Sequence, residues 1–296
     1  MKQRIISGVI VAAAVIGLGF IGSYPLTMAV MICSLIGYLE LAAVLCPSRT
    51  VKNGGAAQPS GGPDLIALPG FLFAVLYYAG LMGIEWRYGL VNADGMRAAS
   101  DFWAVMLMTA DFLVTMGIYV FTFPRRKSHR VTGALAAFLY APVLMSFLVR
   151  TRNLRHGIYL YLLIFVCASI TDVCALAAGM AFGKHKLAPV LSPKKTIEGA
   201  VGGVLGSAAV SCVIALALRF FEPGTDVLPV FLIIGICGSL IGQTGDLAAS
   251  AIKRNAGIKD YGNLIPGHGG IMDRFDSVLF TAPVIYYLSF LLAGKM

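Results

Sequence analysis

Long uninterrupted runs of apolar residues recur along the chain, and short polar segments separate them. Each run holds about 20 residues, the length at which an α-helix crosses the hydrocarbon core of a bilayer. The pattern therefore predicts an all-α, polytopic integral membrane protein with about nine transmembrane helices. We expect these helices at residues 5–22, 25–46, 64–84, 102–123, 131–149, 157–182, 199–220, 228–252 and 276–293.

The first apolar run and the basic residues indicate the orientation. Residues 5–22 are long for the apolar part of a signal peptide and lack a small-x-small cleavage site, so we interpret them as a membrane helix. If the N-terminus is cytoplasmic, most of the 23 Lys and Arg residues fall in cytoplasmic segments, in line with the positive-inside rule. The cluster Arg150, Arg152 and Arg155 is the exception. Either its loop binds lipid headgroups, or a neighbouring span is re-entrant.

Composition agrees with a membrane protein and narrows its chemistry. Hydrophobic residues make up 58% of the chain, charged residues 12%, and the mean hydropathy is +0.83. A soluble domain carries about twice that share of charge. The six cysteines lie in apolar runs and form no CxxC pair, so we expect small buried hydrophobes rather than disulfides or zinc ligands. Membrane topology and anionic phosphate groups explain the net charge of +9 better than nucleic acid does.

Glycine, proline and serine are concentrated in residues 47–63, which predicts a flexible cytoplasmic linker. It separates a two-helix N-terminal membrane hairpin, residues 1–46, from middle transmembrane helices at residues 64–156. The remaining region, 157–296, contains the densest polar segments of the chain. These segments are residues 172–199 and 242–277. No Walker loop or GxGxxG sequence occurs at a strand-to-helix junction, so a nucleotide site must be built from helices and cytoplasmic loops.

The segment 242–277 begins with a polar stripe on a predicted helix. At 100° per residue, five polar side chains fall within about 100° of one another. They are Gln243, Asp246, Ser250, Lys253 and Arg254. An acid inside a membrane helix is costly and therefore a functional candidate, so Asp246 is a potential metal ligand. The alternative for Asp246 is a salt bridge that orients the helix.

A glycine-rich loop at residues 266–270 follows this helix, and its backbone can come close to a ligand. Asp273 and Asp276 come next, three residues apart and so on one face of the last helix. Carboxylates bind Mg²⁺, while Lys, Arg and backbone N–H groups bind phosphate oxygens. The segment therefore suits a metal-bridged phosphate ligand. The two aspartates could instead be helix N-terminal acids that the macrodipole favours.

Three further acids fall inside predicted spans. Asp172 is either a buried, hydrogen-bonded structural acid or a polar wall of the same cavity, where it would help to hold the nucleotide or a metal-bound water. Glu40 and Asp111 have no evident partners nearby in the sequence, and a structural or interfacial role is the simpler interpretation of each.

Lys194 and Lys195 precede the predicted start of the helix at 199–220. A helix N-terminus flanked by two lysines is an anion site, although a positive-inside loop would also place lysines there. The same helix carries a face of small residues that permits close helix packing. These residues are Gly199, Gly202, Gly203, Gly206 and Ser207.

The two polar segments also resemble the signature of a known family. Residues 250–276 contain S-x-I-K-R, four residues, K-D, and then H-G-G-I-x-D-R-F-D, a pattern similar to that of phosphatidate cytidylyltransferases, the CDP-diacylglycerol synthases. A second block, from Asp172 through Gly183-Lys184 to S-P-K-K-T-x-E-G at residues 192–199, resembles the other characteristic segment of that family. The N-terminal part resembles the family only in its hydrophobic helices. Ala249 stands where many members have a glutamate.

The resemblance implies a CTP:phosphatidate cytidylyltransferase of phospholipid biosynthesis, which makes CDP-diacylglycerol and pyrophosphate from CTP and phosphatidate. It implies Mg²⁺ bound by Asp246, Asp273 and Asp276, and leaves a second cation open. Lys253 and Arg254 join these aspartates as the implied catalytic residues. The implied substrate-binding residues are Asp172, Lys194, Lys195, Ser250, Lys259, His268, Gly269, Gly270 and Arg274. We expect His268 to position a phosphate or a loop carbonyl rather than to transfer a proton.

We accordingly predict a multi-pass protein of the inner cell membrane with its active site facing the cytoplasm, and leave a homodimer open. Two alternatives remain. One is a CTP-dependent enzyme acting on another lipid, either a prenol kinase or an ether-lipid cytidylyltransferase. The other is a lipid transporter, although a transporter has its site near the membrane midplane, whereas the polar residues here gather at one membrane face.

Overall fold

The computed structural model describes residues 13–53, 56–89, 93–221, 227–264 and 269–292, and most of them are helical. The chain forms two compact units. Unit 1 contains residues 1–155 and 253–274, and unit 2 contains residues 156–252 and 275–296. Residues 157–296 contribute to both units, and their prediction as one catalytic region stays a prediction.

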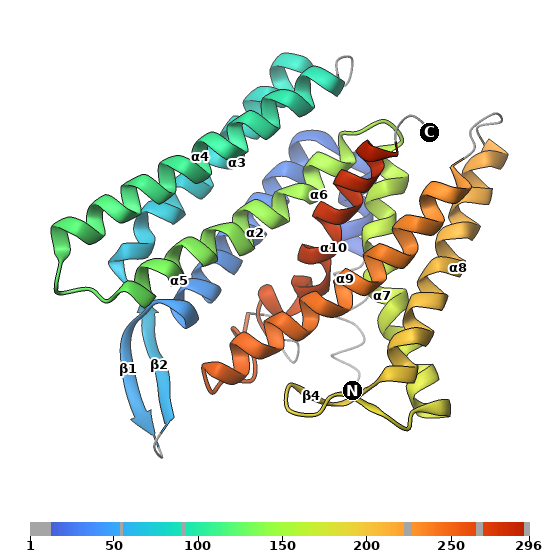
Figure 1. Cartoon of the computed structure of the whole chain (residues 1–296). Coiled ribbons are helices and arrows are strands. Elements are labelled where there is room, and N and C mark those ends of the chain that lie inside the picture. Colours follow the sequence, from blue (N-terminus) through green and yellow to red (C-terminus); the bar gives the residue numbers. More distant parts are fainter. Residues whose placement is uncertain (1–12, 54–55, 90–92, 222–226, 265–268, 293–296) are drawn as a thin grey trace. The chain divides into compact units, whose positions relative to one another are not determined.

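The helices in chain order are drawn in Figure 1 and span most of the predicted apolar runs. Unit 1 begins with α2 (Ser23–Leu45), α3 (Leu68–Tyr88), α4 (Ala93–Thr122), α5 (Ser128–Phe138) and α6 (Leu144–Arg152). Unit 2 contains α7 (Gly157–Phe182) and α8 (Ile197–Phe221), most of α9 (Leu228–Asn255), and α10 (Met272–Leu291) after its first turn. A short 3₁₀ turn, η1 (Leu65–Ala67), precedes α3, and a π-helical turn, η2 (Leu139–Val143), joins α5 to α6.

Seven helices of the described chain are long and apolar enough to cross a membrane, which confirms the all-α polytopic class. They coincide with the second to eighth predicted spans. Helix α10 occupies the ninth predicted span but is not one of the seven, and residues 5–12 of the first predicted span lie outside the described residues. The count of nine spans is therefore not confirmed.

Buried tyrosine hydroxyls join the helices of unit 1. Helix α2 packs against α3, α5 and α6, and α3 runs beside α4 (Figure 1). Tyr38 of α2 donates a hydrogen bond of 2.6 Å to the carbonyl oxygen of Ala67, and Tyr78 of α3 donates one of 3.0 Å to that of Pro142 in η2. A hydroxyl without a partner would be costly in this apolar interior, so these bonds fix how the helices pack.

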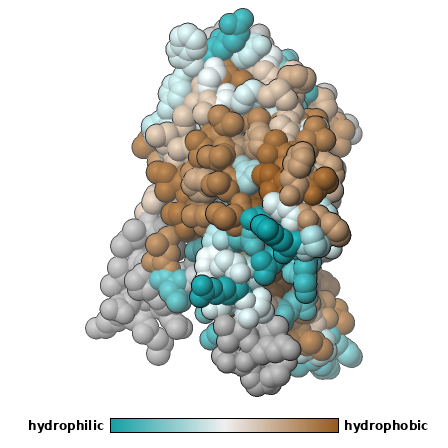
Figure 2. Space-filling view, turned by 90° about the vertical axis from the view of Figure 1, so that its left-hand side faces the viewer, coloured by the Kyte–Doolittle hydropathy of each residue, from teal (hydrophilic) through white to brown (hydrophobic). Residues whose placement is uncertain are grey.

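Hydrophobic side chains cover the outside of these helices. Phe102 and Phe121 of α4 are 70% and 91% exposed, as expected for side chains that face lipid. Figure 2 shows one side of the molecule, on which hydrophobic residues form a broad band with hydrophilic residues beyond it. A band of this kind agrees with helices that cross a bilayer.

The arginine cluster that disturbed the predicted charge distribution is bound within unit 1. Arg150 of α6 pairs with Asp101 of α4 and lies 4.4 Å from the centre of the Phe147 ring. Arg152 donates a hydrogen bond of 2.6 Å to the carbonyl oxygen of Gly19. These two arginines therefore have protein partners, and their position requires neither headgroup binding nor a re-entrant span.

Two short antiparallel hairpins accompany the helices. Strands β1 (Pro47–Asn53) and β2 (Ala56–Pro63) lie in the segment predicted to be a flexible linker. Strands β3 (Lys186–Ala188) and β4 (Ser192–Thr196) connect α7 to α8. Neither hairpin was predicted, because the segments lack the alternating apolar pattern of a half-buried strand. The flexibility and cytoplasmic location of the linker stay predictions.

Helix α9 hydrogen-bonds to each of the other helices of unit 2. Side-chain hydroxyls of α7, α8 and α10 take part, and such bonds join helices in an apolar medium. They link Thr171 to Ser239, Ser207 to Gly235 and Thr281 to Gly238, at 2.7, 3.0 and 3.2 Å.

The small-residue face predicted on α8 packs closely against α7. A Cβ atom at Gly203 would lie 2.9 Å from the carbonyl oxygen of Thr171, and one at Gly206 would meet the side chain of Cys174. This confirms the prediction of close helix packing, and it holds the segment before α8 near α7.

Candidate functional site

The β3–β4 hairpin leads directly into the N-terminus of α8, which confirms the predicted helix start. The backbone N–H of Gly199 donates to the Thr196 hydroxyl at 3.1 Å, a standard N-terminal cap. Glu198 accepts a hydrogen bond from the backbone N–H of Lys184 at 3.1 Å and lies 2.7 Å from Nδ1 of His185. The hairpin is thereby fastened at both ends, and β4 presents Lys194 and Lys195 at a fixed place.

Residues from three elements of unit 2 meet around one lysine. The Lys195 ammonium of β4 pairs with the Asp246 carboxylate of α9, and both side chains are 26% exposed. Asp172 of α7 lies within electrostatic range of both. The structure thus brings together three of the predicted site residues. Asp172 and Asp246 lie 23 and 51 positions from Lys195 in the sequence, and no local pattern indicated that they would meet it.

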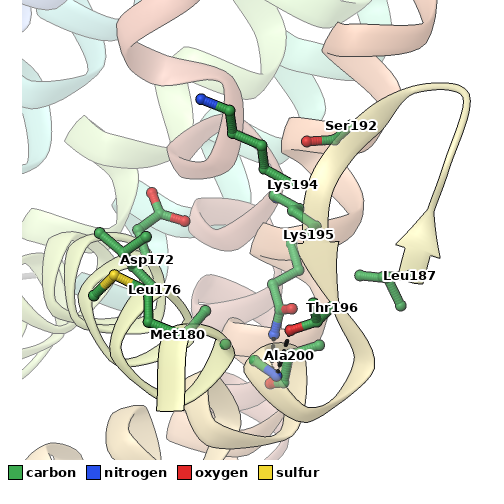
Figure 3. A pocket seen from close by; sticks show the side chains of 13 residues that line it. Asp172, Leu176, Met180, Leu187, Ser192, Lys194, Lys195, Thr196 and Ala200 are labelled. Atoms are coloured by element: carbon green, nitrogen blue, oxygen red, sulfur yellow. Dashed lines mark hydrogen bonds between the residues drawn. The ribbon is translucent and has the colours of Figure 1, made fainter. Parts of the chain in front are cut away.

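A pocket of about 450 Å³ opens beside this cluster. Asp172, Leu176 and Met180 of α7 form one wall, and Lys194, Lys195 and Thr196 form the opposite one (Figure 3). Gln243 of α9 and Gly199 of α8 also line it. Leu176 and Met180 are 64% and 74% exposed, so the apolar wall continues onto the outer face of α7. The pocket therefore combines cationic and apolar surfaces.

Helix α9 packs closely on α10 where the backbone of Asp276 meets Gly245, the residue before Asp246. A Cβ atom at Gly245 would lie 2.8 Å from the backbone carbonyl oxygen of Asp276, so only glycine permits this approach. Asp276 Oδ1 accepts a hydrogen bond of 2.8 Å from the backbone N–H of Ser277. The two aspartates thus occur where α9 and α10 come together within unit 2.

The last loop of unit 1 is organised around a buried ion pair. Lys253 donates to Asp273 Oδ1 at 2.7 Å, and their side chains are 11% and 2% exposed. Asp273 Oδ2 accepts from the backbone N–H groups of Tyr261 and Gly270, at 2.7 and 3.0 Å. Gly269 has a φ of +82°, which favours glycine, and a Cβ atom there would lie 2.7 Å from the same carboxylate. Asp273 therefore holds both sides of the loop together.

The remaining predicted residues have different surroundings. Arg254, Lys259 and Arg274 are exposed, and Arg254 donates to the carbonyl oxygen of Ile258 at 3.2 Å. Ser250 is half-buried on α9. His268 lies outside the described residues, and its role stays a prediction.

The aspartates predicted to bind Mg²⁺ differ in their fit to the ion. Asp246 fits a hard cation, because it is partly exposed, has the Asp172 carboxylate in electrostatic range and pairs with the partly exposed Lys195. Asp273 fits less well, because its oxygens already accept three hydrogen bonds. Within the described part of the chain, no three His, Cys, Asp or Glu side chains gather closely enough to hold a metal ion. The joint binding of a metal by Asp246, Asp273 and Asp276 stays a prediction.

Two acidic residues of these regions have contacts that the sequence did not predict. Glu198 binds the start of the β3–β4 hairpin through His185. From the sequence alone, Glu198 is recognisable only as an acidic residue in the first turn of α8. Glu40 of α2 accepts hydrogen bonds from the backbone of Ile271 and Met272. No local pattern could reveal this contact, because the partners are more than two hundred residues apart.

Comparison with known proteins gives a family match over nearly the whole chain. The model of the cytidylyltransferase family matches residues 2–292. The chain is 32% identical over 293 residues to a phosphatidate cytidylyltransferase of Bacillus subtilis (strain 168), which covers 97% of each protein.

Two shorter matches agree with this result. A phosphatidate cytidylyltransferase of Staphylococcus saprophyticus is 38% identical over 181 residues, or 60% of this chain and 67% of the relative. One of Staphylococcus aureus (strain COL) is 36% identical over 189 residues, or 62% of this chain and 70% of the relative.

Proposed function

Because the chain belongs to the cytidylyltransferase family, we propose that it transfers the cytidylyl group of CTP to phosphatidate, giving CDP-diacylglycerol and pyrophosphate. The observation that carries the proposal is the pocket of unit 2, where Lys194 and Lys195 face an apolar wall that reaches the outer surface of α7. Phosphatidate needs both surfaces, because its phosphate binds cations while its acyl chains remain in an apolar environment. The relatives reported above favour neither of the alternatives raised from the sequence, a CTP-dependent enzyme acting on another lipid or a lipid transporter.

The proposed reaction is an in-line substitution at the α-phosphorus of CTP. An oxygen of the phosphatidate phosphate forms the new P–O bond, and the bond between the α-phosphorus and its bridging oxygen breaks. Pyrophosphate leaves with that electron pair. Catalysis of this kind rests on positioning and on neutralising phosphate charge.

The residues of unit 2 supply these two effects in the proposal. Lys194 and Lys195 neutralise phosphate oxygens, and the N-terminus of α8 directly after them adds its partial positive charge. Asp172 offers a polar contact on the opposite wall of the pocket, and Gln243 is a further polar residue of its lining. Asp246 holds Lys195 in place until substrate phosphates compete for the ammonium.

Mg²⁺ belongs to the proposal as a cofactor, with Asp246 as its principal ligand and Asp276, in the same unit, as a second predicted ligand. Bound there, the ion would neutralise phosphate charge and orient the substrate. Asp273 remains a ligand by the sequence prediction. The exposed Arg254, Lys259 and Arg274 are proposed to neutralise further phosphate charge.

The proposal is tested by supplying purified protein with phosphatidate, Mg²⁺ and CTP labelled at either the α- or the γ-phosphorus. We expect label from the α-position to enter the lipid fraction and label from the γ-position to leave as pyrophosphate. Transfer of the γ-label to lipid would instead show a kinase. No lipid-linked label from either position, with phosphatidate bound normally, would contradict the proposed function.

We also propose that the site faces the cytoplasm, since most Lys and Arg residues lie in segments predicted to be on that side. In a variant without native cysteines, a cysteine replacing Val190, which is 86% exposed, should react only with a reagent on the cytoplasmic side. A cysteine replacing Trp86, 81% exposed at the end of α3, is the control and should react only from outside. Reaction of both from one side would rule out this topology.

A further inference from the structure

Glu40 is the only charged residue of helix α2, and it has backbone partners in the last loop of unit 1. Its Oε1 accepts a hydrogen bond of 3.1 Å from the N–H of Ile271, and its Oε2 accepts one of 3.0 Å from the N–H of Met272. Both oxygens thus bind consecutive N–H groups at the start of α10, an arrangement suited to an ionised carboxylate.

The partners of Glu40 explain why a charged group is tolerated in an apolar helix. The first N–H groups of a helix have no partner within that helix and carry partial positive charge. A capping side chain normally comes from the residue just before the helix. In α10 the capping side chain is instead Glu40, 231 positions before Ile271 in the chain. The charge-assisted hydrogen bonds offset part of the cost of removing the Glu40 carboxylate from water.

The loop is also shaped to fit this carboxylate. A Cβ atom at Gly262 would lie 2.6 Å from Glu40 Oε1, and a Cβ atom at Gly270 would clash with both carboxylate oxygens. One turn earlier on α2, a Cβ atom at Gly37 would lie 3.0 Å from the sulfur of Met272, which is fully buried. Both sides of the loop therefore pack against α2.

Two carboxylates consequently hold the segment before α10 from two directions. Asp273 accepts a hydrogen bond from the N–H of Gly270, while Glu40 accepts hydrogen bonds from the N–H groups of Ile271 and Met272. The loop carries Lys259, and it ends at Asp273 and Arg274. The family resemblance predicts roles for these three residues in the reaction. Any shift of the segment would move these side chains together.

We propose that Glu40 is a positioning residue, which fixes residues 269–274, at the start of α10, in the conformation needed for turnover. Helix α2 is then a working part of the enzyme and not only a membrane anchor. The inference rests on the proposed cytidylyl transfer for its activity measurement, while protection of the loop amides from hydrogen exchange measures the contact independently.

The first test compares Glu40→Gln with Glu85→Gln. Glu85 is a matched control, since it is a buried acid of α3 in the same unit and bonds to Thr27 and Asn153 instead of the loop. We expect Glu40→Gln to lower kcat about 10- to 100-fold, the range for groups that orient functional residues, with a much smaller change in KM. Faster exchange at Ile271 and Met272 should accompany this loss, and Glu40→Asp should give an intermediate kcat. Glu85→Gln should change neither measurement.

The second test is a double-mutant cycle between Glu40 and Gly262, a glycine with no assigned role in the reaction. Gly262→Ala alone should lower kcat, because its methyl group displaces the loop from the carboxylate. In a Glu40→Ala background, which removes the opposing group, the same change should have a clearly smaller effect.

Three results would overturn the inference: full kcat in Glu40→Gln, unchanged exchange at Ile271 and Met272, or strictly additive effects in the cycle. An inactive wild-type protein whose exchange rates respond to Glu40→Gln would instead contradict the proposed function and leave the contact established.

Discussion

Replacing Asp246 with asparagine is expected to lower kcat by at least about 100-fold while leaving the protein folded, in line with losses measured when preorganised charge is removed from an active site. The change removes the negative charge that holds Lys195 and, in the proposed function, Mg²⁺. Stability should change little, because both partners are partly exposed, and such ion pairs contribute about 0–1 kcal/mol. Turnover per folded protein, measured in detergent with phosphatidate and CTP, checks the prediction.

The dependence on Mg²⁺ separates a metal ligand from a simple salt-bridge partner. If Asp246 binds the ion, Asp246→Asn should raise the Mg²⁺ concentration for half-maximal activity. Lys195→Gln should not raise it, because that change removes a competing cation. Asp64→Asn is the control, since Asp64 also forms ion pairs, with Arg126 and Arg130. It should leave the Mg²⁺ dependence unchanged. If the Asp246→Asn protein keeps more than about a tenth of wild-type activity, a loss below ~1.4 kcal/mol, Asp246 is not a metal ligand.

The sequence predicted the helices well because hydropathy is a local property. Each apolar run has to satisfy its backbone hydrogen bonds internally, so length and composition alone indicate a helix. The start of α8 after Lys195 was predicted for the same reason, from neighbouring residues. Helix α10 shows the limit of this reasoning. It was predicted as a membrane span, but it carries charged residues in its first turn and is not among the seven helices that are long and apolar enough to cross a membrane.

The contacts that organise the polar regions of the two units could not be predicted, because they join distant parts of the chain. Lys195 meets Asp246 across 51 positions, and Glu40 meets Met272 across 232. The β1–β2 hairpin lies in a segment whose glycines and prolines indicate a linker, yet its backbone groups pair with each other. In each case the partner, and not the local sequence, decides the conformation.

The buried pair of Lys253 and Asp273 provides the second large effect, on stability. Lys253→Met or Asp273→Asn alone should each lower the free energy of unfolding by about 3–5 kcal/mol, because the remaining charge is left buried without its partner. The N–O distance of 2.7 Å and the burial of both side chains make this a strongly coupled pair. Thermal unfolding in detergent measures the loss. Arg254→Gln is the control, since this neighbouring cation is exposed and should change stability by less than about 0.5 kcal/mol.

Combining Lys253→Met with Asp273→Asn distinguishes a structural pair from a catalytic one. The double variant has no unpaired charge, and the asparagine oxygen still accepts the N–H groups of Tyr261 and Gly270, so most of the lost stability should return. Turnover should remain lost, because the charges that the proposed reaction uses are gone. Recovery of both stability and turnover would show that the pair only holds the loop, and would remove Asp273 from the metal ligands. Single variants as stable as the wild type would contradict the burial of the pair itself.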